Sequence, residues 1–213
     1  MLKSIPPEFK KYFDNHCLWL ETYGEHGQRA VLNGADLSDL DLQGVKLKGA
    51  NMAGADMSGV LLRAADLTDA NLEGCRLEHA KLQWANLAGA NISNAIITGA
   101  DLQFTNFSRA ILESTDFENA HLHNTWFWQS IIGGSNFSGA RFHFASFASS
   151  HLKRTRFKRA VLNNTEFNNA DLQECDFTNA SIALCDMTGT RLRRCDFTGA
   201  KLVQVDLPES NPN

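Results

Sequence analysis

A five-residue period runs through almost the whole chain and limits what it can fold into. Every fifth residue from Leu32 to Leu207 is Leu, Phe, Ile or Met, without an exception. Two residues before each of these lies a small or apolar residue, most often Ala, and the residue between the two is often Asp or Asn, as in Ala35-Asp36-Leu37. A period of five matches neither the 3.6 residues of a helical turn nor the alternation of a strand, so simple helices and strands are excluded.

The pattern instead predicts a short extended segment, a turn, and then a further segment rotated against the first. The large residue and the small one two places before it share one side of an extended chain, so both point inward. Two residues after each large residue, Gly, Asn or Asp is common, and these residues supply the backbone conformations of turns. Four such segments close a square coil, and only the stacking of successive coils buries the apolar face of each.

The phenylalanines support a coil of four segments. The chain has 14 Phe against 2 Tyr and 4 Trp. When coils stack in register, residues one coil apart share a column, and two columns of Phe have that spacing. One column contains Phe117, Phe137, Phe157, Phe177 and Phe197, and the other contains Phe107, Phe127, Phe147 and Phe167. Because aromatic and aliphatic segments mostly alternate here, the coil must have an even number of sides.

These repeats resemble the pentapeptide repeat family, whose consensus is A-[DN]-L-x-x. The resemblance covers residues 30–209 and implies an all-β fold, a right-handed quadrilateral parallel β-helix of about nine coils. At a strand spacing of about 4.8 Å, such a solenoid is a rod roughly 43 Å long. Residues 1–29 are expected to form an N-terminal capping segment, and residues 210–213 a C-terminal tail.

The capping segment is expected to contain a short helix from Ile5 to about Cys17, because two prolines suit its first turn. Leu18–Glu21 is expected to be extended, and Gly24–Gly27 to form a turn into the first coil. The resemblance to the family extends into this segment. The entry segment of many bacterial members has a spacing similar to that of His16, Trp19, Leu20, Gly24, Gly27, Arg29 and Ala30. Trp19 and Leu20 would then cover the open end of the core and hide strand edges.

Composition and charge exclude several classes of protein. There are 20 Lys and Arg against 24 Asp and Glu, which gives a net charge of -4 and no general attraction to nucleic acids or membranes. No run of residues approaches the roughly 18 apolar residues of a membrane span, and the N-terminus lacks a signal-peptide pattern. A cytoplasmic protein without direct nucleic-acid binding is therefore expected.

Cysteines, histidines and catalytic motifs give little indication of chemistry. Four of the five cysteines occupy the small inward position, which favours apolar packing over ligand binding. His121, His123 and His143 occupy neighbouring outward positions, so a surface metal site is one alternative, although Arg141 adds a cation there. No nucleophile elbow or phosphate-binding loop is present, and no insertion interrupts the repeats. The sequence predicts no enzyme and no cofactor.

Basic residues are concentrated near the C-terminal end of the repeats, at 153–159 and 191–194. Stacking places Asp171 and Glu174 between Arg154 and Arg194. The pattern therefore favours a salt-bridged ladder over a track for phosphate groups.

Exposed aromatic residues are the best indication of a binding site. Turn positions usually take Gly, Asn or Asp, so bulky aromatic residues there act against the local preference. Trp is typical of binding hot spots, and an exposed apolar patch usually marks an interface. The candidate partner-binding residues are Trp84, Phe104 and Phe144 in one turn column, and Trp126 and Trp128 on the next side of the coil.

These features predict a non-catalytic interaction scaffold for an unidentified protein partner. The resemblance implies an alternative, because some family members are quinolone-resistance proteins that mimic B-form DNA and protect DNA gyrase. A DNA mimic needs a continuous acidic face, which interleaved Lys and Arg do not provide. The last coil, residues 190–209, has no helix to cover it, which predicts a homodimer formed through this C-terminal coil.

Overall fold

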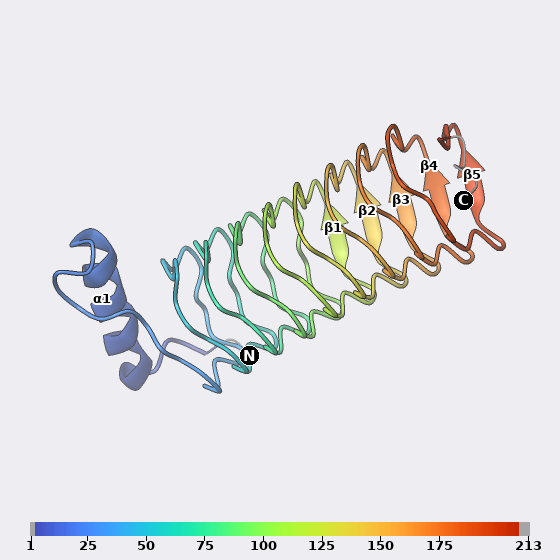
Figure 1. Cartoon of the computed structure of the whole chain (residues 1–213). Coiled ribbons are helices and arrows are strands. Elements are labelled where there is room, and N and C mark those ends of the chain that lie inside the picture. Colours follow the sequence, from blue (N-terminus) through green and yellow to red (C-terminus); the bar gives the residue numbers. More distant parts are fainter. Residues whose placement is uncertain (1–2, 209–213) are drawn as a thin grey trace.

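The computed structural model describes residues 3–208, which form a long rod with one helix lying across its N-terminal end (Figure 1). Helix α1 spans Pro7–Glu21. Five short strands lie side by side in the C-terminal half of the rod (Figure 1). They are β1 (His121–His123), β2 (Arg141–His143), β3 (Val161–Asn163), β4 (Ser181–Ala183) and β5 (Lys201–Val203). Residues 210–213, expected to be a tail, lie outside the described residues.

Successive coils pair in parallel at a constant offset of 20 residues. β1 to β5 form one sheet in chain order, with Leu122 opposite Phe142 and so on along the rod. Elsewhere the pairing is reduced to isolated bridges, which carry the same offset from Val31 and Asn51 onward. Each side of a coil holds only a few extended residues between turns. For this reason only five of the described coils contain a segment long enough to count as a strand, which is fewer than the roughly nine coils predicted.

The coil has four sides, which we number by the large inward residue at the centre of each. Side 1 is centred on Leu32, side 2 on Leu37, side 3 on Leu42 and side 4 on Leu47, and each side returns every 20 residues. β1 to β5 belong to side 3. This arrangement confirms the predicted parallel β-solenoid.

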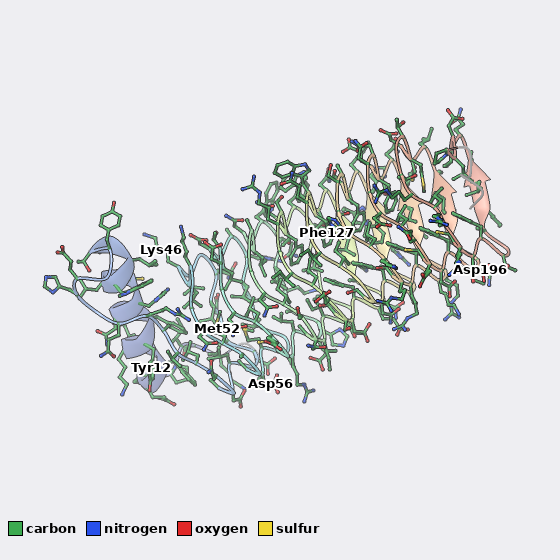
Figure 2. The ribbon with its side chains drawn as sticks, viewed as in Figure 1. Tyr12, Lys46, Met52, Asp56, Phe127 and Asp196 are labelled. Atoms are coloured by element: carbon green, nitrogen blue, oxygen red, sulfur yellow. The ribbon has the colours of Figure 1, made fainter. Side chains whose placement is uncertain are left out.

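The large inward residues form one continuous core along the rod. From Leu37 to Met187, every fifth residue is at most 1% exposed. The two predicted Phe columns are confirmed: Phe157 stacks on Phe177 at 5.0 Å within a column, and it meets Phe167 of the other column edge-on at 6.0 Å and 89°. Stacked and edge-to-face rings are the favoured aromatic geometries. Figure 2 shows Phe127 in the interior of the rod.

Every turn ends with a residue in the left-handed region. From Gly34 to Gln204, the fifth residue of each repeat has φ between 50° and 75°. None of these residues is β-branched, which agrees with the poor fit of Val, Ile and Thr to positive φ. At Gly59 a side chain is disfavoured for lack of space as well as by the positive φ, because a Cβ there would lie 2.5 Å from Oδ1 of Asp39 in the preceding coil.

Helix α1 is longer than the sequence predicts, and the extended segment expected at Leu18–Glu21 is wrong. The helix continues through these residues and ends where the backbone N–H of Thr22 donates to the Leu18 carbonyl. Between Pro7 and Gly24 there is no glycine or proline to stop it earlier. Trp19 and Leu20 are only partly buried, so they are not the main cover of the core.

The open end of the core is covered instead by Phe13 and His16 of α1, which are 6% and 0% exposed. Phe9 and Ile5 pack beside them. The N-terminal segment also covers a strand edge, because Lys3 pairs in parallel with Leu40 of the first coil. Within residues 3–208, no helix is long and apolar enough to cross a membrane.

Candidate functional site

The five candidate residues lie at the corner after side 3 and on the adjoining side 4. We call Trp84, Phe104, Phe144, Trp126 and Trp128 the aromatic strip. The first three occupy the turn column, with φ of 64°, 58° and 55°. A left-handed backbone is unfavourable for residues with large side chains, so the turn itself gives no reason for aromatic residues here.

Trp84 and Phe104 form the most ordered part of the aromatic strip. Their rings are parallel within 1° and their centroids are 4.0 Å apart. Trp84 is 60% exposed, whereas Phe104 is half-buried because Trp84 covers it. The pair therefore presents one broad aromatic surface to solvent rather than two separate rings.

Phe144 continues the same column after a gap. Asn124 occupies the position between Phe104 and Phe144, so these two rings belong to coils about 10 Å apart along the rod. Phe144 is 55% exposed, and its ring centroid lies 4.2 Å from that of His143. Three of the four successive turn residues at positions 84, 104, 124 and 144 are therefore aromatic.

Trp126 and Trp128 flank the inward Phe127 on side 4. Trp126 is bridged on one side to Asn106 and on the other to Ser146, whose short side chains leave the indole 44% exposed. Trp128 is 40% exposed, and the guanidinium of Arg109 lies 5.1 Å from its ring centroid. A cation over an indole is a favourable contact, so Trp128 is partly covered by its own chain.

The structure therefore brings Trp84 and Phe104 into contact and places the other three nearby without ring stacking among them. Within residues 3–208, the ring pairs of the aromatic strip are Trp84–Phe104 and His143–Phe144. Sequence register predicted the positions and the outward direction. It did not predict the stack, because only the side-chain torsions decide which rings meet.

The histidine cluster is less suited to a metal than its spacing suggests. The rings of His123 and His143 are 6.0 Å apart and inclined at 65°. Burial lowers the pKa of His123, and the neighbouring His143 and His121 lower it further. Among the described residues, no group of three or more His, Cys, Asp and Glu side chains is arranged to hold a metal ion.

The cysteines at the small inward position are unpaired thiols held in the core. Sγ of Cys75 donates to the carbonyl of Met52 at 2.9 Å, and Sγ of Cys195 donates to that of Leu172 at 2.8 Å. Burial raises the pKa of Cys75 to about 12 and that of Cys195 to about 11. Such thiols are inert as nucleophiles, because the reactive form is the thiolate.

The salt-bridged ladder expected near the C-terminal end is mostly absent. Within residues 3–208, the only ion pair of this region joins Nζ of Lys158 to Oδ2 of Asp176 at 3.1 Å. Asp171 instead accepts hydrogen bonds from the backbone and side-chain amides of Gln173. The expectation fails because local hydrogen bonds within a turn compete well with flexible, solvated arginine side chains.

Two hollows in the described part of the surface lie away from the aromatic strip. One of about 360 Å³ separates α1 from the first coil and is lined by residues that include Tyr12 and Arg29. Another of about 290 Å³ lies between coils near His151, Asp171 and Arg191. Both are open depressions lined mainly by exposed polar side chains. Neither combines a nucleophile with a buried base.

Comparison with known proteins identifies the family. A family model described as pentapeptide repeats matches in 8 copies, over residues 28–63, 65–103, 100–139, 124–158, 140–179 and 175–211. The chain therefore belongs to the pentapeptide repeat family. None of the curated proteins matches it.

Several solved structures are similar to this chain. HetL, a pentapeptide repeat protein involved in heterocyst differentiation regulation from the cyanobacterium Nostoc, is 25% identical, with a TM-score of 0.39 over 87% of this chain and 88% of HetL. QnrB1, a plasmid-mediated fluoroquinolone resistance protein, is 22% identical, with a TM-score of 0.47 over 82% of this chain and 85% of QnrB1. The Nostoc pentapeptide repeat protein alr5209 is 31% identical, with a TM-score of 0.30 over 60% of this chain and 94% of alr5209.

Proposed function

We propose that this protein is a non-catalytic scaffold that binds a protein partner through the aromatic strip. The observation that carries the proposal is the parallel stack of Trp84 on Phe104 at two left-handed turn positions. Asp and Gly fit that backbone better, and the core gains nothing from rings that face solvent. Large, rigid aromatic surfaces of this kind are typical anchors of protein interfaces.

The regular solenoid supports a binding role rather than catalysis. Its sides are built from short segments with tight turns, and the described hollows are shallow. A continuous rod instead offers long flat sides for contact with other macromolecules.

A partner capture experiment tests the proposal. The protein is immobilised and exposed to an extract of its source cells, and the proteins retained are compared among the wild type and two variants. Trp84→Ala/Phe104→Ala removes the stack, whereas Ile111→Ala/Ile131→Ala removes two exposed apolar residues that are bridged on side 1 and 38% and 42% exposed. We expect the second variant to retain the same partner as the wild type and the first to lose it. Equal retention by both variants would contradict the proposal.

The C-terminal coil is a second candidate contact, in this case with another copy of the chain. Leu202 and Val203 of β5 are 41% and 55% exposed, and their strand is paired in the described structure only with β4. Docking of two such coils would bury these residues and extend the sheet. A Val203→Lys variant is expected to lose such a dimer in sedimentation experiments, and an unchanged association state would exclude it.

The DNA-mimic alternative receives no support from the charge distribution. The outward column of side 2 contains Arg76 and Arg156 between its aspartates, so its potential changes sign along the rod. A gyrase inhibitor of that type needs an unbroken acidic side.

A further inference from the structure

Side 2 carries an ordered pattern of charge that neither the core nor the aromatic strip explains. Its first outward column is a continuous series of parallel bridges along the rod. The column reads Asp36, Asp56, Arg76, Ile96, Asp116, Asn136, Arg156, Asp176 and Asp196. Figure 2 shows Asp56 and Asp196 along the same lower side of the rod.

The order of charges in this column is complementary to the same column read in the opposite direction, with Ile96 as the centre. Reversal places Arg156 opposite Asp36 and Arg76 opposite Asp116, and it sets the neutral Asn136 opposite Asp56. The adjoining turn column follows the same rule, because reversal about the same coil places Arg159 opposite Asp39. Opposite charges therefore meet at three places, and Ile96, which is 40% exposed, meets itself at the centre.

A two-fold axis produces this reversal in space. Consider two rods whose side 2 surfaces meet, related by a two-fold axis that lies in the contact and is perpendicular to both rods. The rods are then antiparallel, and each column of side 2 faces the same column of the second rod with its coils in reverse order. We propose that side 2 binds a second copy of this chain in an antiparallel, side-by-side dimer centred on Ile96. This contact is distinct from the aromatic strip and from the C-terminal coil.

Three of the side chains involved are free for such a contact, whereas Asp39 already lies 3.8 Å from Nζ of Lys3 and Asp116 accepts a hydrogen bond from Nδ2 of Asn136. Arg156 and Arg159 are exposed, and within residues 3–208 their guanidinium groups make no ion pair and donate no hydrogen bond to another side chain. The exposed Asp36 accepts one hydrogen bond, from the backbone N–H of Ser38. A planar guanidinium binds a carboxylate with two hydrogen bonds, so these groups suit pairing across the axis.

One like-charged pair opposes the arrangement. Reversal places Glu78 opposite Glu118 in the second outward column of side 2. The charge of Glu78 is already compensated, because its Oε1 lies 3.1 Å from the guanidinium of Arg76. Arg76 can therefore bridge Glu78 of its own chain and Asp116 of the second copy.

The size of the surface indicates a weak and salt-sensitive dimer. Six coil spacings separate Asp36 from Arg156, so the paired region is about 29 Å long and only one side of the coil wide. Interfaces of small area rest more on charge complementarity than on apolar burial. We expect association at about 50 mM salt and dissociation at about 500 mM, where charges are screened beyond a few ångströms.

Charge reversal and complementation test the proposal by sedimentation velocity of the full chain at low salt. Arg156→Asp and Asp36→Arg each place like charges on both sides of the axis, so each variant alone is expected to associate at least about tenfold more weakly than the wild type. An equimolar mixture of the two variants restores opposite charges at both places and is expected to regain wild-type association. Asp and Arg both occur naturally in this column, and circular dichroism confirms that each variant is folded.

A matched control separates this contact from others. Arg194→Asp makes the same change of charge at the corner between sides 1 and 2, in a coil beyond the region paired from Asp36 to Arg156, and is expected to leave association unchanged. A wild-type protein that stays monomeric at low salt and high concentration would overturn the proposal. So would a dimer that is insensitive to Arg156→Asp but is lost in Val203→Lys, because that result assigns the contact to the C-terminal coil.

Discussion

At the scale of single residues, the core depends on where each side chain points within its repeat. Phe157 is fully buried, with Phe137 at 5.3 Å on one side and Phe177 at 5.0 Å on the other. Trp128, only one place away from an inward Phe, is 40% exposed. A shift of one residue thus separates a structural aromatic residue from a surface one.

This difference gives a stability prediction. Phe157→Ala should lower the free energy of unfolding by about 3–5 kcal/mol, because it leaves a cavity between stacked rings. Trp128→Ala should cost about 1 kcal/mol or less, since its side chain lies on the surface, is 40% exposed and leaves no cavity in the core when removed. Equilibrium unfolding in denaturant measures both values. A comparable loss in the two variants would mean that inside and outside are interchanged in this segment.

The small inward position contributes hydrogen bonds as well as volume. The hydroxyl of Thr105 donates to the Leu82 carbonyl at 2.8 Å, and that of Thr125 donates to the Leu102 carbonyl at 2.9 Å. The donor and acceptor lie in successive coils. Thr, Ser and Cys therefore replace Ala at this position without leaving an unsatisfied polar group in most coils.

At the scale of elements, α1 is held by close backbone contact with the segment that leads from it into the first coil. Gly27 lies against the helix with φ of 74°, and a Cβ there would be 2.7 Å from the backbone N of Trp19 and closer still to the Asn15 carbonyl. Gly34 has a similar φ of 66°, but nothing lies within 4 Å of the place that its Cβ would occupy.

These two glycines form a matched pair for mutation. Gly34→Ala should cost about 1 kcal/mol, which is the penalty for a left-handed alanine. Gly27→Ala adds a clash with backbone and should in addition detach α1, with faster hydrogen exchange of the α1 amides. Hydrogen exchange followed by mass spectrometry measures this. Equal exchange in the two variants would contradict the close packing of helix and coil.

His16 makes the attachment of α1 sensitive to pH. Its Nδ1 accepts a hydrogen bond from the backbone N–H of Ala30 at 3.0 Å, which requires an unprotonated Nδ1. Burial lowers the pKa of His16 below its ordinary value of 6.5; the Lys48 backbone opposes this shift and the charge of Arg29 adds to it. The detached helix therefore binds a proton that the attached helix does not.

It follows that the attached state is fully stable above about pH 6.5 and loses stability as the pH falls through the lowered pKa. Amide chemical shifts of α1, followed by NMR between about pH 7.5 and about pH 5, should report a transition to the detached helix. His16→Gln supplies an acceptor that does not titrate, so its α1 shifts should stay constant. A transition that persists in this variant would assign it to another group.

At the scale of the whole molecule, stability comes from each coil covering its neighbours. Leu162 and Leu202 occupy the same column of side 3, but Leu162 is fully buried and Leu202 is 41% exposed. Solenoids add stability through contacts between adjacent repeats, so a coil covered on both faces contributes more than one covered on a single face.

The same substitution should therefore have unequal effects along the rod. Leu162→Ala should cost about 2–5 kcal/mol, whereas Leu202→Ala should cost about 1 kcal/mol or less. Thermal or denaturant unfolding of the two variants at low protein concentration provides the comparison. A large loss from Leu202→Ala under these conditions would show that the last coil is covered in solution.

The sequence by itself determined the solenoid, the direction of its side chains and the columns that stack along it. A five-residue period with four sides assigns each residue to the inside, the outside or a turn, and parallel pairing then sets Phe157 over Phe177 without further information. The turn positions were equally predictable, because Gly, Asn and Asp are common there and no β-branched residue occupies them. Such regular features repeat, so each coil provides an independent copy of the same signal.

Only the tertiary structure decided how the non-repeating parts and the long side chains are placed. It extended α1 through Leu18–Glu21, stacked Trp84 on Phe104, and left Arg156 free while Asp171 bonded to Gln173. These outcomes depend on side-chain torsions and on competition among contacts of similar energy, about 1 kcal/mol each. A five-residue pattern states which face a residue occupies, but it does not state which neighbour that residue contacts.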